Sequence, residues 1–247
     1  MPAGVGAFFI KETDSTNCLA ASEAAAGRAG PDWFIAGHQT AGKGRRGNVW
    51  DGATGNLYSS LLWRPALKPA DLSALPYITA LAVRDTIVSF GVDSARVTCK
   101  WPNDLLLDEK KVTGILIESS VKQSGMLDYV IIGIGVNLTF HPETAFGATD
   151  LFEATGVMVS VADFHAKLAA SMTDRINAWN VDDFATTAAE WSGCAWGLGE
   201  RREFRLSDRT EVGTLIGLAD DGGLKVQLDE GAEIRLYAGD VFPVTEK

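Results

Sequence analysis

Cysteine and histidine are scarce in this chain and are scattered along it. The three cysteines, Cys18, Cys99 and Cys194, include no CxxC pair, and the three histidines show no HExxH spacing. Structural zinc sites and disulfide frameworks both depend on such close, repeated spacings, so neither is expected. No Ser-His-Asp or Cys-His arrangement indicates nucleophilic catalysis by a side chain either.

Long apolar runs are missing as well. No stretch approaches the roughly eighteen consecutive apolar residues of a membrane helix, and the N-terminal segment lacks the basic start and the apolar length of a signal peptide. Positive charge is in deficit, because 22 Lys and Arg face 32 Asp and Glu, for a formal net charge of −10. Nucleic-acid binding needs a basic face. We therefore expect a cytoplasmic protein that binds neither DNA nor membranes.

Apolar residues make up 46% of the 247 residues, which suits one large domain or a medium domain with a small satellite. The first predicted helix is capped by Asp14 or Ser15 and runs to about Arg28. The turns at 108–110 and 122–125 indicate hairpins and therefore antiparallel pairing. Periodicity predicts three more helices, at about 72–90, 162–179 and 182–191, and strands at 7–11, 33–39, 56–63, 96–101, 104–108, 111–119 and 127–138.

The pattern of predicted elements changes after Gly199. Short predicted strands follow one another every eight to ten residues, separated by turns such as DDGG at 220–223. This spacing is typical of a small closed β-barrel. We predict two domains, 1–195 and 196–247, with barrel strands at 202–206, 211–217, 224–228, 233–238 and 240–244.

The segment GHQTAGKGRRG, residues 37–47, is rich in glycine and basic residues. It resembles a phosphate-binding P-loop, but Gly44 stands where that loop needs Ser or Thr, and no helical pattern follows. It also fails as a dinucleotide-binding fingerprint, because neither a helix nor the later acidic residue follows. Two interpretations remain: a glycine loop whose amides and basic side chains bind an anion, or a solvated basic loop.

Two further segments carry polar residues beside apolar strands. In KWPNDLLLDEKKVTGILIES, residues 100–119, Asn103 and Asp104 lie at a strand edge, and Lys111 begins the next strand with Gly114 three residues on. In GIGVNL, residues 133–138, Asn137 ends a long apolar strand. A buried Asn needs hydrogen-bond partners. An ordinary hairpin with solvated lysines and a strand-terminating turn are the alternative interpretations.

Six motifs together resemble the biotin protein ligase family: DSTN at 14–17, QTAGKGRRGNVW at 39–50, GNLYSSLL at 55–62, KWPNDLLL at 100–107, KVTGILIES at 111–119 and GIGVNL at 133–138. Their order and spacing match over residues 8–140. The resemblance implies an α+β fold with a mixed, largely antiparallel sheet flanked by helices, of the class II synthetase or biotinyl/lipoyl ligase type, and a C-terminal SH3-like β-barrel. Because DSTN begins at residue 14, we expect the short form without an N-terminal DNA-binding domain.

The resemblance also implies a two-step reaction with ATP and Mg²⁺. Biotin and ATP form biotinoyl-AMP, and a lysine of the biotin carboxyl carrier domain of acetyl-CoA carboxylase, or of a related carboxylase, then takes up the biotinoyl group. Family members often form homodimers. Arg45 and Lys111 are the implied catalytic cations, since they offset the repulsion between the biotin carboxylate and the α-phosphate.

By the same resemblance, the glycine loop is expected to be mobile when empty and to close over the intermediate. Mg²⁺ is expected to be held mainly by phosphate oxygens and water, with Asp104 as a possible ligand. Two positions depart from the family pattern: Lys43 replaces the usual arginine, and Thr113 replaces a smaller residue. The implied biotin contacts are Ser15, Thr16, Asn17, Gln39, Gly42, Lys43, Gly44, Arg45, Lys111 and Gly114. The implied ATP contacts are Arg46, Trp50, Asn103, Asp104 and Asn137.

Two rival functions stay open at this point. A lipoate or octanoate ligase has a similar fold and similar chemistry, although the KWPND and GKGRRG segments favour biotin. A non-catalytic biotin-binding sensor is the other rival, and the presence of both Arg45 and Lys111 argues against it.

Overall fold

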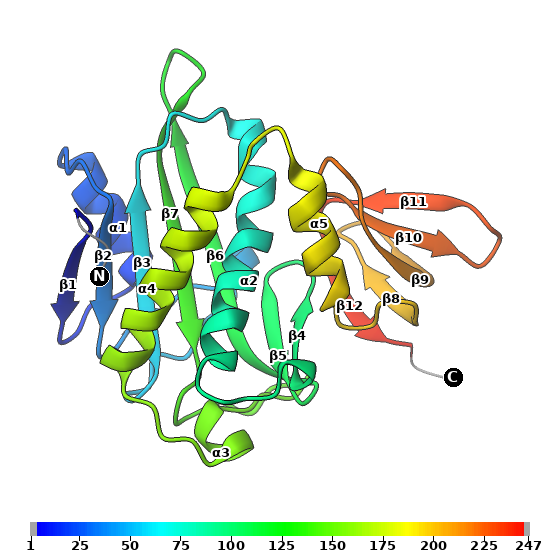
Figure 1. Cartoon of the computed structure of the whole chain (residues 1–247), viewed down its shortest axis with the longest axis horizontal. Helices are drawn as coiled ribbons and strands as arrows, with labels where there is room; N and C mark the ends of the chain where they lie inside the picture. The colour runs from blue at the N-terminus through cyan, green and yellow to red at the C-terminus, as the bar shows by residue number, and fades with distance from the viewer. Residues whose placement is uncertain (1–3, 245–247) are drawn as a thin grey trace.

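The computed structural model describes residues 4–244 and is built on a seven-stranded sheet (Figure 1). The strand order is β1-β2-β3-β7-β6-β5-β4. Only β1 and β2 are parallel among these neighbours, and the two predicted hairpins form the β5–β6 and β6–β7 pairs. The strands are β1 (Gly6–Ile10), β2 (Asp32–Ala36), β3 (Leu57–Trp63), β4 (Val97–Lys100), β5 (Asp104–Leu107), β6 (Lys110–Val121) and β7 (Leu127–Val136).

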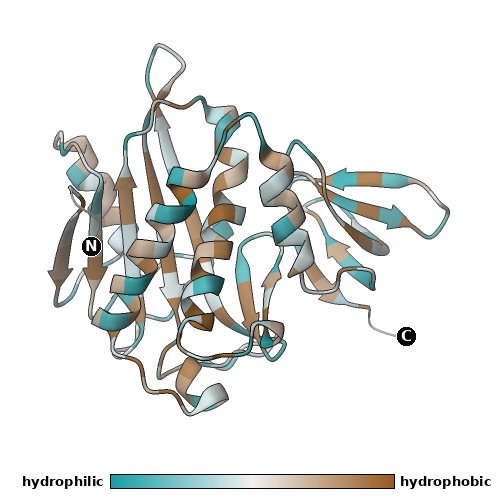
Figure 2. Cartoon of the chain, viewed as in Figure 1, coloured by the Kyte–Doolittle hydropathy of each residue, from teal (hydrophilic) through white to brown (hydrophobic). Residues whose placement is uncertain are grey.

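Helices cover both faces of this sheet. Figure 1 shows α2 and α4 crossing one face. Alternation along β2 places Trp33 and Ile35 in the core with these two helices, whereas Phe34 packs with α1 on the opposite face. Figure 2 shows apolar residues along the strands, while α4 mixes apolar and polar residues. The helices are α1 (Thr16–Ala25), α2 (Leu75–Val88), α3 (Leu151–Thr155), α4 (Val161–Ala178) and α5 (Phe184–Gly193).

A second, five-stranded sheet follows α5 at the C-terminal end. Its strands are all antiparallel, in the order β11-β10-β9-β8-β12. The apolar side chains of Phe204 and Val241 join the same continuous core as the large sheet. The two sheets and their flanking helices confirm the predicted α+β class. The strands are β8 (Arg201–Arg205), β9 (Thr210–Leu218), β10 (Leu224–Leu228), β11 (Glu233–Leu236) and β12 (Asp240–Pro243).

Some element boundaries differ from those predicted. Helix α1 ends at Ala25 rather than near Arg28, because Gly27 adopts a positive φ of 91°. A 3₁₀ segment at 69–74 precedes α2. Helix α3 was not predicted, since its five residues are too short for a periodic pattern. Between residues 4 and 244, no helix combines the length and apolar character that a membrane span needs. The predicted domain boundary at 195/196 stays a prediction.

Candidate active site

A cavity of about 590 Å³ opens where the large sheet meets the second sheet. Its walls come from the start of α1, the glycine loop, strands β3 to β7, the segment 144–146 and β12. The cavity brings together thirteen of the predicted site residues: Ser15, Thr16, Asn17, Gln39, Lys43, Gly44, Arg45, Arg46, Trp50, Asn103, Asp104, Lys111 and Gly114. Gly42 and Asn137 are the two predicted residues outside this lining.

The glycine loop is folded as a small hairpin. Gly42 accepts a hydrogen bond from the backbone N–H of Trp50 at 3.0 Å, and Gly44 donates one to the carbonyl of Asn48 at 2.8 Å. A Cβ on Gly42 would lie 2.5 Å from the Trp50 carbonyl oxygen, so a side chain does not fit there. At the tip, Arg46 adopts a left-handed conformation with a φ of 55°. The hairpin therefore sets Arg45 and Arg46 at a tight turn on the cavity wall.

The same hairpin carries Trp50 onto the sheet. Gly114 of β6 pairs with Gly135 of β7, and a Cβ on either glycine would lie 2.6 Å from the Trp50 indole. Two facing glycines thus form a flat seat for the ring. In this structure the indole of Trp50 covers Gly114, a residue that the family resemblance implies as a biotin contact.

One end of the cavity, called here the neutral end, is built from buried uncharged side chains. Gln39 Oε1 accepts a hydrogen bond from the Thr16 backbone N–H at 2.8 Å. The Ser60 hydroxyl lies 2.6 Å from Asn17 Oδ1 and 2.8 Å from Thr16 Oγ1. Because an amide carbonyl oxygen can only accept, the Ser60 hydroxyl donates its one proton to Asn17 Oδ1. In its contact with Ser60, the Thr16 hydroxyl is therefore the donor. Thr16, Asn17, Gln39 and Ser60 are the members of this end, each at most 8% exposed.

Asn17 is held from its other side too. Its Nδ2 donates to Glu118 Oε2 at 2.7 Å and to the Leu116 carbonyl at 3.3 Å. Ser15, the residue directly before α1, makes no capping hydrogen bond with its side chain, and it is only 2% exposed at the cavity wall. The neutral end is consequently a fixed network in which the orientation of each amide is set by its partners.

A second part of the cavity, called here the charged end, joins three cations to the PND segment. Lys111 Nζ lies 2.7 Å from Asp104 Oδ1, and Lys100 Nζ lies 3.9 Å from Asp104 Oδ2. Arg45 donates to Asn103 Oδ1 at 3.2 Å, and Asn103 Nδ2 donates to the Ile115 carbonyl at 2.7 Å. Burial lowers the pKa of both Lys100 and Arg45 below their usual values. A bound anion would offset that desolvation and favour the charged forms.

The cavity carries more positive than negative side chains, although the chain as a whole is negatively charged. Five basic side chains line it, against the carboxylates of Asp104 and Asp240. Asp240 of β12 pairs with Arg46 at 2.9 Å and so connects the glycine loop to the second sheet. The pKa of Lys43 is raised, chiefly by its interaction with the Cys18 side chain of α1. The positive surplus favours an anionic ligand.

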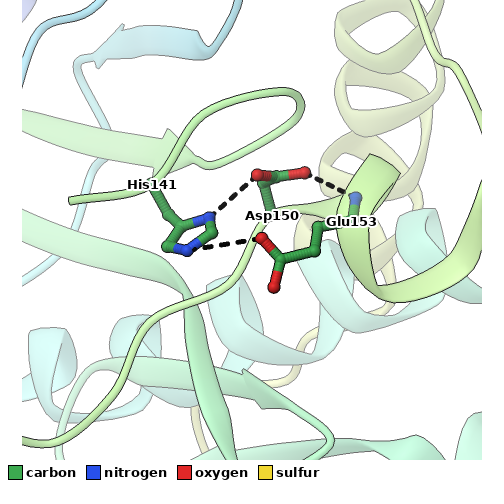
Figure 3. Close-up of side chains that lie close together, drawn as sticks. All are labelled: His141, Asp150 and Glu153. Carbon is green, nitrogen blue, oxygen red and sulfur yellow. Dashed lines mark hydrogen bonds and ion pairs between the residues drawn. The ribbon is translucent and has the colours of Figure 1, made fainter. Parts of the chain in front are cut away.

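Asn137, which directly follows β7, lies outside the cavity lining. Its Nδ2 donates to the Thr149 carbonyl at 3.0 Å, so the amide predicted for ATP here joins the two ends of the loop 137–149. Figure 3 shows a second set of contacts across the same loop, between His141 and the carboxylates of Asp150 and Glu153. His141 Nδ1 lies 2.9 Å from Asp150, and its Nε2 lies 3.5 Å from Glu153. These contacts join the two ends of the loop that carries the lining residues 144–146.

Several cavity residues were not predicted from the sequence. Lys100 lies inside the KWPND motif, but the sequence alone does not show that this lysine is buried. Phe146, Asp240 and Phe242 come from segments without a distinctive motif, and only the fold brings them to the cavity. The Lys100 ammonium faces the rings of Phe146 and Phe242 at 4.6 and 5.5 Å from their centroids.

Comparison with known proteins agrees with this geometry. Residues 9–137 match the Biotin/lipoate A/B protein ligase family, and residues 197–242 match the Biotin protein ligase C terminal domain. A biotin–[acetyl-CoA-carboxylase] ligase of Paracoccus denitrificans is 34% identical over 94% of this chain and 98% of its own length. A ligase of the same description from Mycobacterium tuberculosis is 30% identical over 94% of this chain and 86% of its own length.

Solved structures support the same relationship. The biotin protein ligase from Aquifex aeolicus in complex with biotin and ATP superposes with a TM-score of 0.79 at 26% identity, over 96% of this chain and 97% of that one. The likeness therefore includes both the fold of the large sheet and that of the C-terminal sheet. With two matching family segments and relatives of similar length, the chain belongs to the biotin/lipoate A/B protein ligase family, as one of its biotin protein ligases.

Proposed function

We propose that this ligase activates biotin with ATP as biotinoyl-5′-AMP and then transfers the biotinoyl group to a lysine of a biotin carboxyl carrier domain. The observation that carries the proposal is a single cavity with a neutral hydrogen-bonding end and a cationic end. Relatives of nearly the full length carry the name biotin–[acetyl-CoA-carboxylase] ligase, which supports the carrier domain of that carboxylase as the acceptor.

The neutral end suits the ureido ring of biotin, an uncharged group with both donors and acceptors. Ser15 and Thr16 keep hydroxyl groups at the cavity wall, and Gln39 lies beside them. A site built on fixed, buried hydrogen-bond partners discriminates strongly against a ligand without matching groups. Lipoate has an apolar dithiolane ring in that position and octanoate has none, so this end favours biotin over both.

The charged end suits the first chemical step. An oxygen of the biotin carboxylate attacks the α-phosphorus of ATP, the bond from that phosphorus to the α,β-bridging oxygen breaks, and pyrophosphate leaves with that oxygen. Two anions must approach each other, and Arg45 and Lys111 offset their repulsion. Lys111 is paired with Asp104 and Arg45 with Asn103, so both cations are already positioned. Arg46, Trp50 and Asn103 complete the proposed ATP side.

Mg²⁺ fits this site as a companion of the phosphates. The cavity carboxylates are Asp104 and Asp240, and each already has a basic partner. Mg²⁺ commonly keeps several water ligands and takes one or two carboxylates together with substrate phosphates. Asp104 is the residue we propose for such a contact, because its buried carboxylate lies between Lys100 and Lys111. The ion neutralises phosphate charge when bound.

The second step needs little further machinery. The amine of the acceptor lysine attacks the biotinoyl carbonyl carbon, and AMP leaves with the electrons of the anhydride bond. Because water would compete as a nucleophile, the intermediate has to be shielded. Trp50, which lies against Gly114 and Gly135, and the segment 144–146 line the cavity, and we propose that they supply that shield.

Biotin-dependent exchange of labelled pyrophosphate into ATP tests the first step. Wild type should exchange with biotin, and neither lipoate nor octanoate should replace it. Arg45→Ala should lower the exchange rate by roughly 10²-fold or more, as expected for a lost cation at a site of developing charge. Arg201→Ala is the matched control, since Arg201 pairs with Asp229 at the surface of the second sheet.

Each alternative has its own outcome in this assay. Exchange with lipoate alone would assign the chain to the lipoate branch of the family. Biotin binding by calorimetry without any exchange would mean that the chain is a sensor. Transfer to a purified carrier domain, detected by its gain of biotin mass, then tests the second step separately.

A further inference from the structure

Two of the three cysteines lie side by side, although 95 positions separate them in the sequence. The Sγ atoms of Cys99 and Cys194 are 3.6 Å apart. The backbone holds them there, because Cys99 N–H donates to the Cys194 carbonyl at 2.8 Å and Trp196 N–H donates to the Cys99 carbonyl at 2.9 Å. Strand β4 and the end of α5 are thus fixed against each other on both sides of the thiols.

The two thiols differ in environment. Cys99 is completely buried, while Cys194 is partly exposed. The pKa of Cys194 is lowered, chiefly by its hydrogen bond with Cys99 and further by the Arg84 guanidinium, whereas the same hydrogen bond and burial raise the pKa of Cys99. A more acidic, accessible thiol beside a protected one is the arrangement in which one sulfur reacts and the other resolves.

We propose that Cys99 and Cys194 form a redox modification site that a peroxide converts into a disulfide. The Cys194 thiolate attacks one peroxide oxygen, which gives a sulfenic acid and releases the other oxygen as hydroxide. The Cys99 thiol then attacks the sulfenic sulfur, the S–S bond forms, and water leaves. The two sulfurs together lose two electrons and two protons, and a thiol reductant reverses the change.

The position of the pair gives the disulfide a structural consequence. Cys99 directly precedes Lys100 of the charged end, and Cys194 stands two residues before Trp196, whose ring packs on Phe146 with 5.5 Å between centroids. The bond would therefore join strand β4, which leads into the charged end, covalently to the end of α5, which packs behind Phe146 through Trp196. It would also close a long loop of the chain, which restricts the unfolded state and raises the midpoint of thermal unfolding.

Peptide mapping of the full chain without reductant tests the proposal. After treatment with hydrogen peroxide, the expected product is a Cys99–Cys194 cross-linked peptide, lighter by two hydrogen atoms and released by dithiothreitol. Cys18→Ser is the matched control, because Cys18 lies on α1 away from the pair and its loss should leave the cross-link intact. Cys194→Ser should abolish the cross-link and leave Cys99 as a free thiol.

The oxidised wild type should also unfold at a temperature several degrees higher than the reduced protein, and its segment 194–199 should exchange amide hydrogens more slowly. Three free thiols after peroxide treatment of the folded protein would overturn the proposal. So would a bridge that involves Cys18 or a second chain, or a Cys194 that advances to sulfinic acid while Cys99 stays reduced. All of these outcomes are read on the wild type, so they do not depend on a variant that folds.

Discussion

The two ends of the cavity solve different problems with different groups. At the neutral end, Thr16, Asn17, Gln39 and Ser60 are buried and are bonded to one another before any ligand binds. At the charged end, Lys111 keeps about a quarter of its side chain exposed, and its partner Asp104 can release it to a substrate anion. The neutral end is therefore a rigid network that selects a ligand by its hydrogen-bonding groups. At the charged end, by contrast, a substrate anion can replace the carboxylate of Asp104 as the partner of Lys111.

This difference predicts which variants should weaken biotin binding and which should slow the reaction. Removing a member of a fixed, neutral network leaves a buried partner unsatisfied and weakens binding of the uncharged ligand group. Removing a cation aimed at developing charge leaves binding of that group almost unchanged and slows the reaction. Variants at the two ends should accordingly affect KM for biotin and kcat to different extents.

The largest expected effect is at the charged end. Lys111→Met removes the ammonium while keeping the apolar stem, and it should lower the rate of biotin-dependent pyrophosphate exchange by roughly 10²–10³-fold. Measured at saturating substrates, the loss should appear in kcat, with a much smaller change in the KM for biotin. Lys110→Met is the matched control, because Lys110 is the exposed neighbour on the same strand.

A result in which both lysine variants behave alike would break the comparison. It would mean that Lys111 contributes only general positive potential. A large rise in KM for biotin without a loss of kcat would mean that Lys111 serves biotin binding rather than the chemical step.

A buried histidine outside the cavity tests how a buried neutral group behaves when it lacks the hydrogen bonds of the neutral end. His165 of α4 packs edge-on against Trp33 with 5.0 Å between centroids, and within the described part of the chain neither ring nitrogen has a hydrogen-bond partner. Burial lowers its pKa from 6.5 to about 4. As the pH falls, His165 therefore takes up a proton in the unfolded chain at a higher pH than in the folded protein. The stability that neutral His165 allows above pH 6.5 is lost as the pH falls towards 4.

The free energy of unfolding should fall by up to about 3 kcal/mol over that interval because of this one group. Urea titrations between pH 7 and pH 4 measure it. His165→Phe keeps an aromatic ring in the core and should flatten the decline. A variant with the same slope as wild type would show that other groups cause the acid sensitivity.

The next effect belongs to the neutral end. Ser60→Ala deprives Asn17 Oδ1 of its donor in a buried site, and it should raise KM for biotin about 10-fold with little change in kcat. Ser59→Ala is a close control, because Ser59 is equally buried and its hydroxyl has no partner within residues 4–244. Equal effects of the two variants on KM would mean that Ser60 acts through packing alone.

The sequence was informative wherever a motif carried the chemistry within a few residues. Arg45, Asn103, Asp104 and Lys111 were predicted because their segments resemble a known pattern, and the cavity gathers them. Strands and long helices followed from periodicity, since each covers several turns or alternations. The antiparallel pairing of β5, β6 and β7 followed from hairpin turns that are local in the chain.

What the sequence did not reveal depends on distant contacts. Ser60 was read as part of a strand, and its link to Asn17 joins positions 43 apart. Phe146 and Asp240 have no motif, and only the packing of the loop 137–149 and of β12 brings them to the cavity. Asn137 was expected to face ATP, but polarity at a strand end cannot distinguish a ligand contact from the backbone contact with Thr149 that the structure contains.

The smallest expected effect is at the contact between the charged end and the second sheet. The Arg46–Asp240 ion pair is exposed by about two-fifths on each side, and exposed pairs contribute at most about 1 kcal/mol. Asp240→Asn should thus raise KM for ATP less than about fivefold, and added salt should shrink the difference because it screens the pair in wild type. Asp229→Asn, which breaks the surface pair with Arg201, is the control. A loss of kcat much greater than fivefold would mean that the second sheet positions the glycine loop for the reaction, so that the charged end would share the rigidity now assigned to the neutral one.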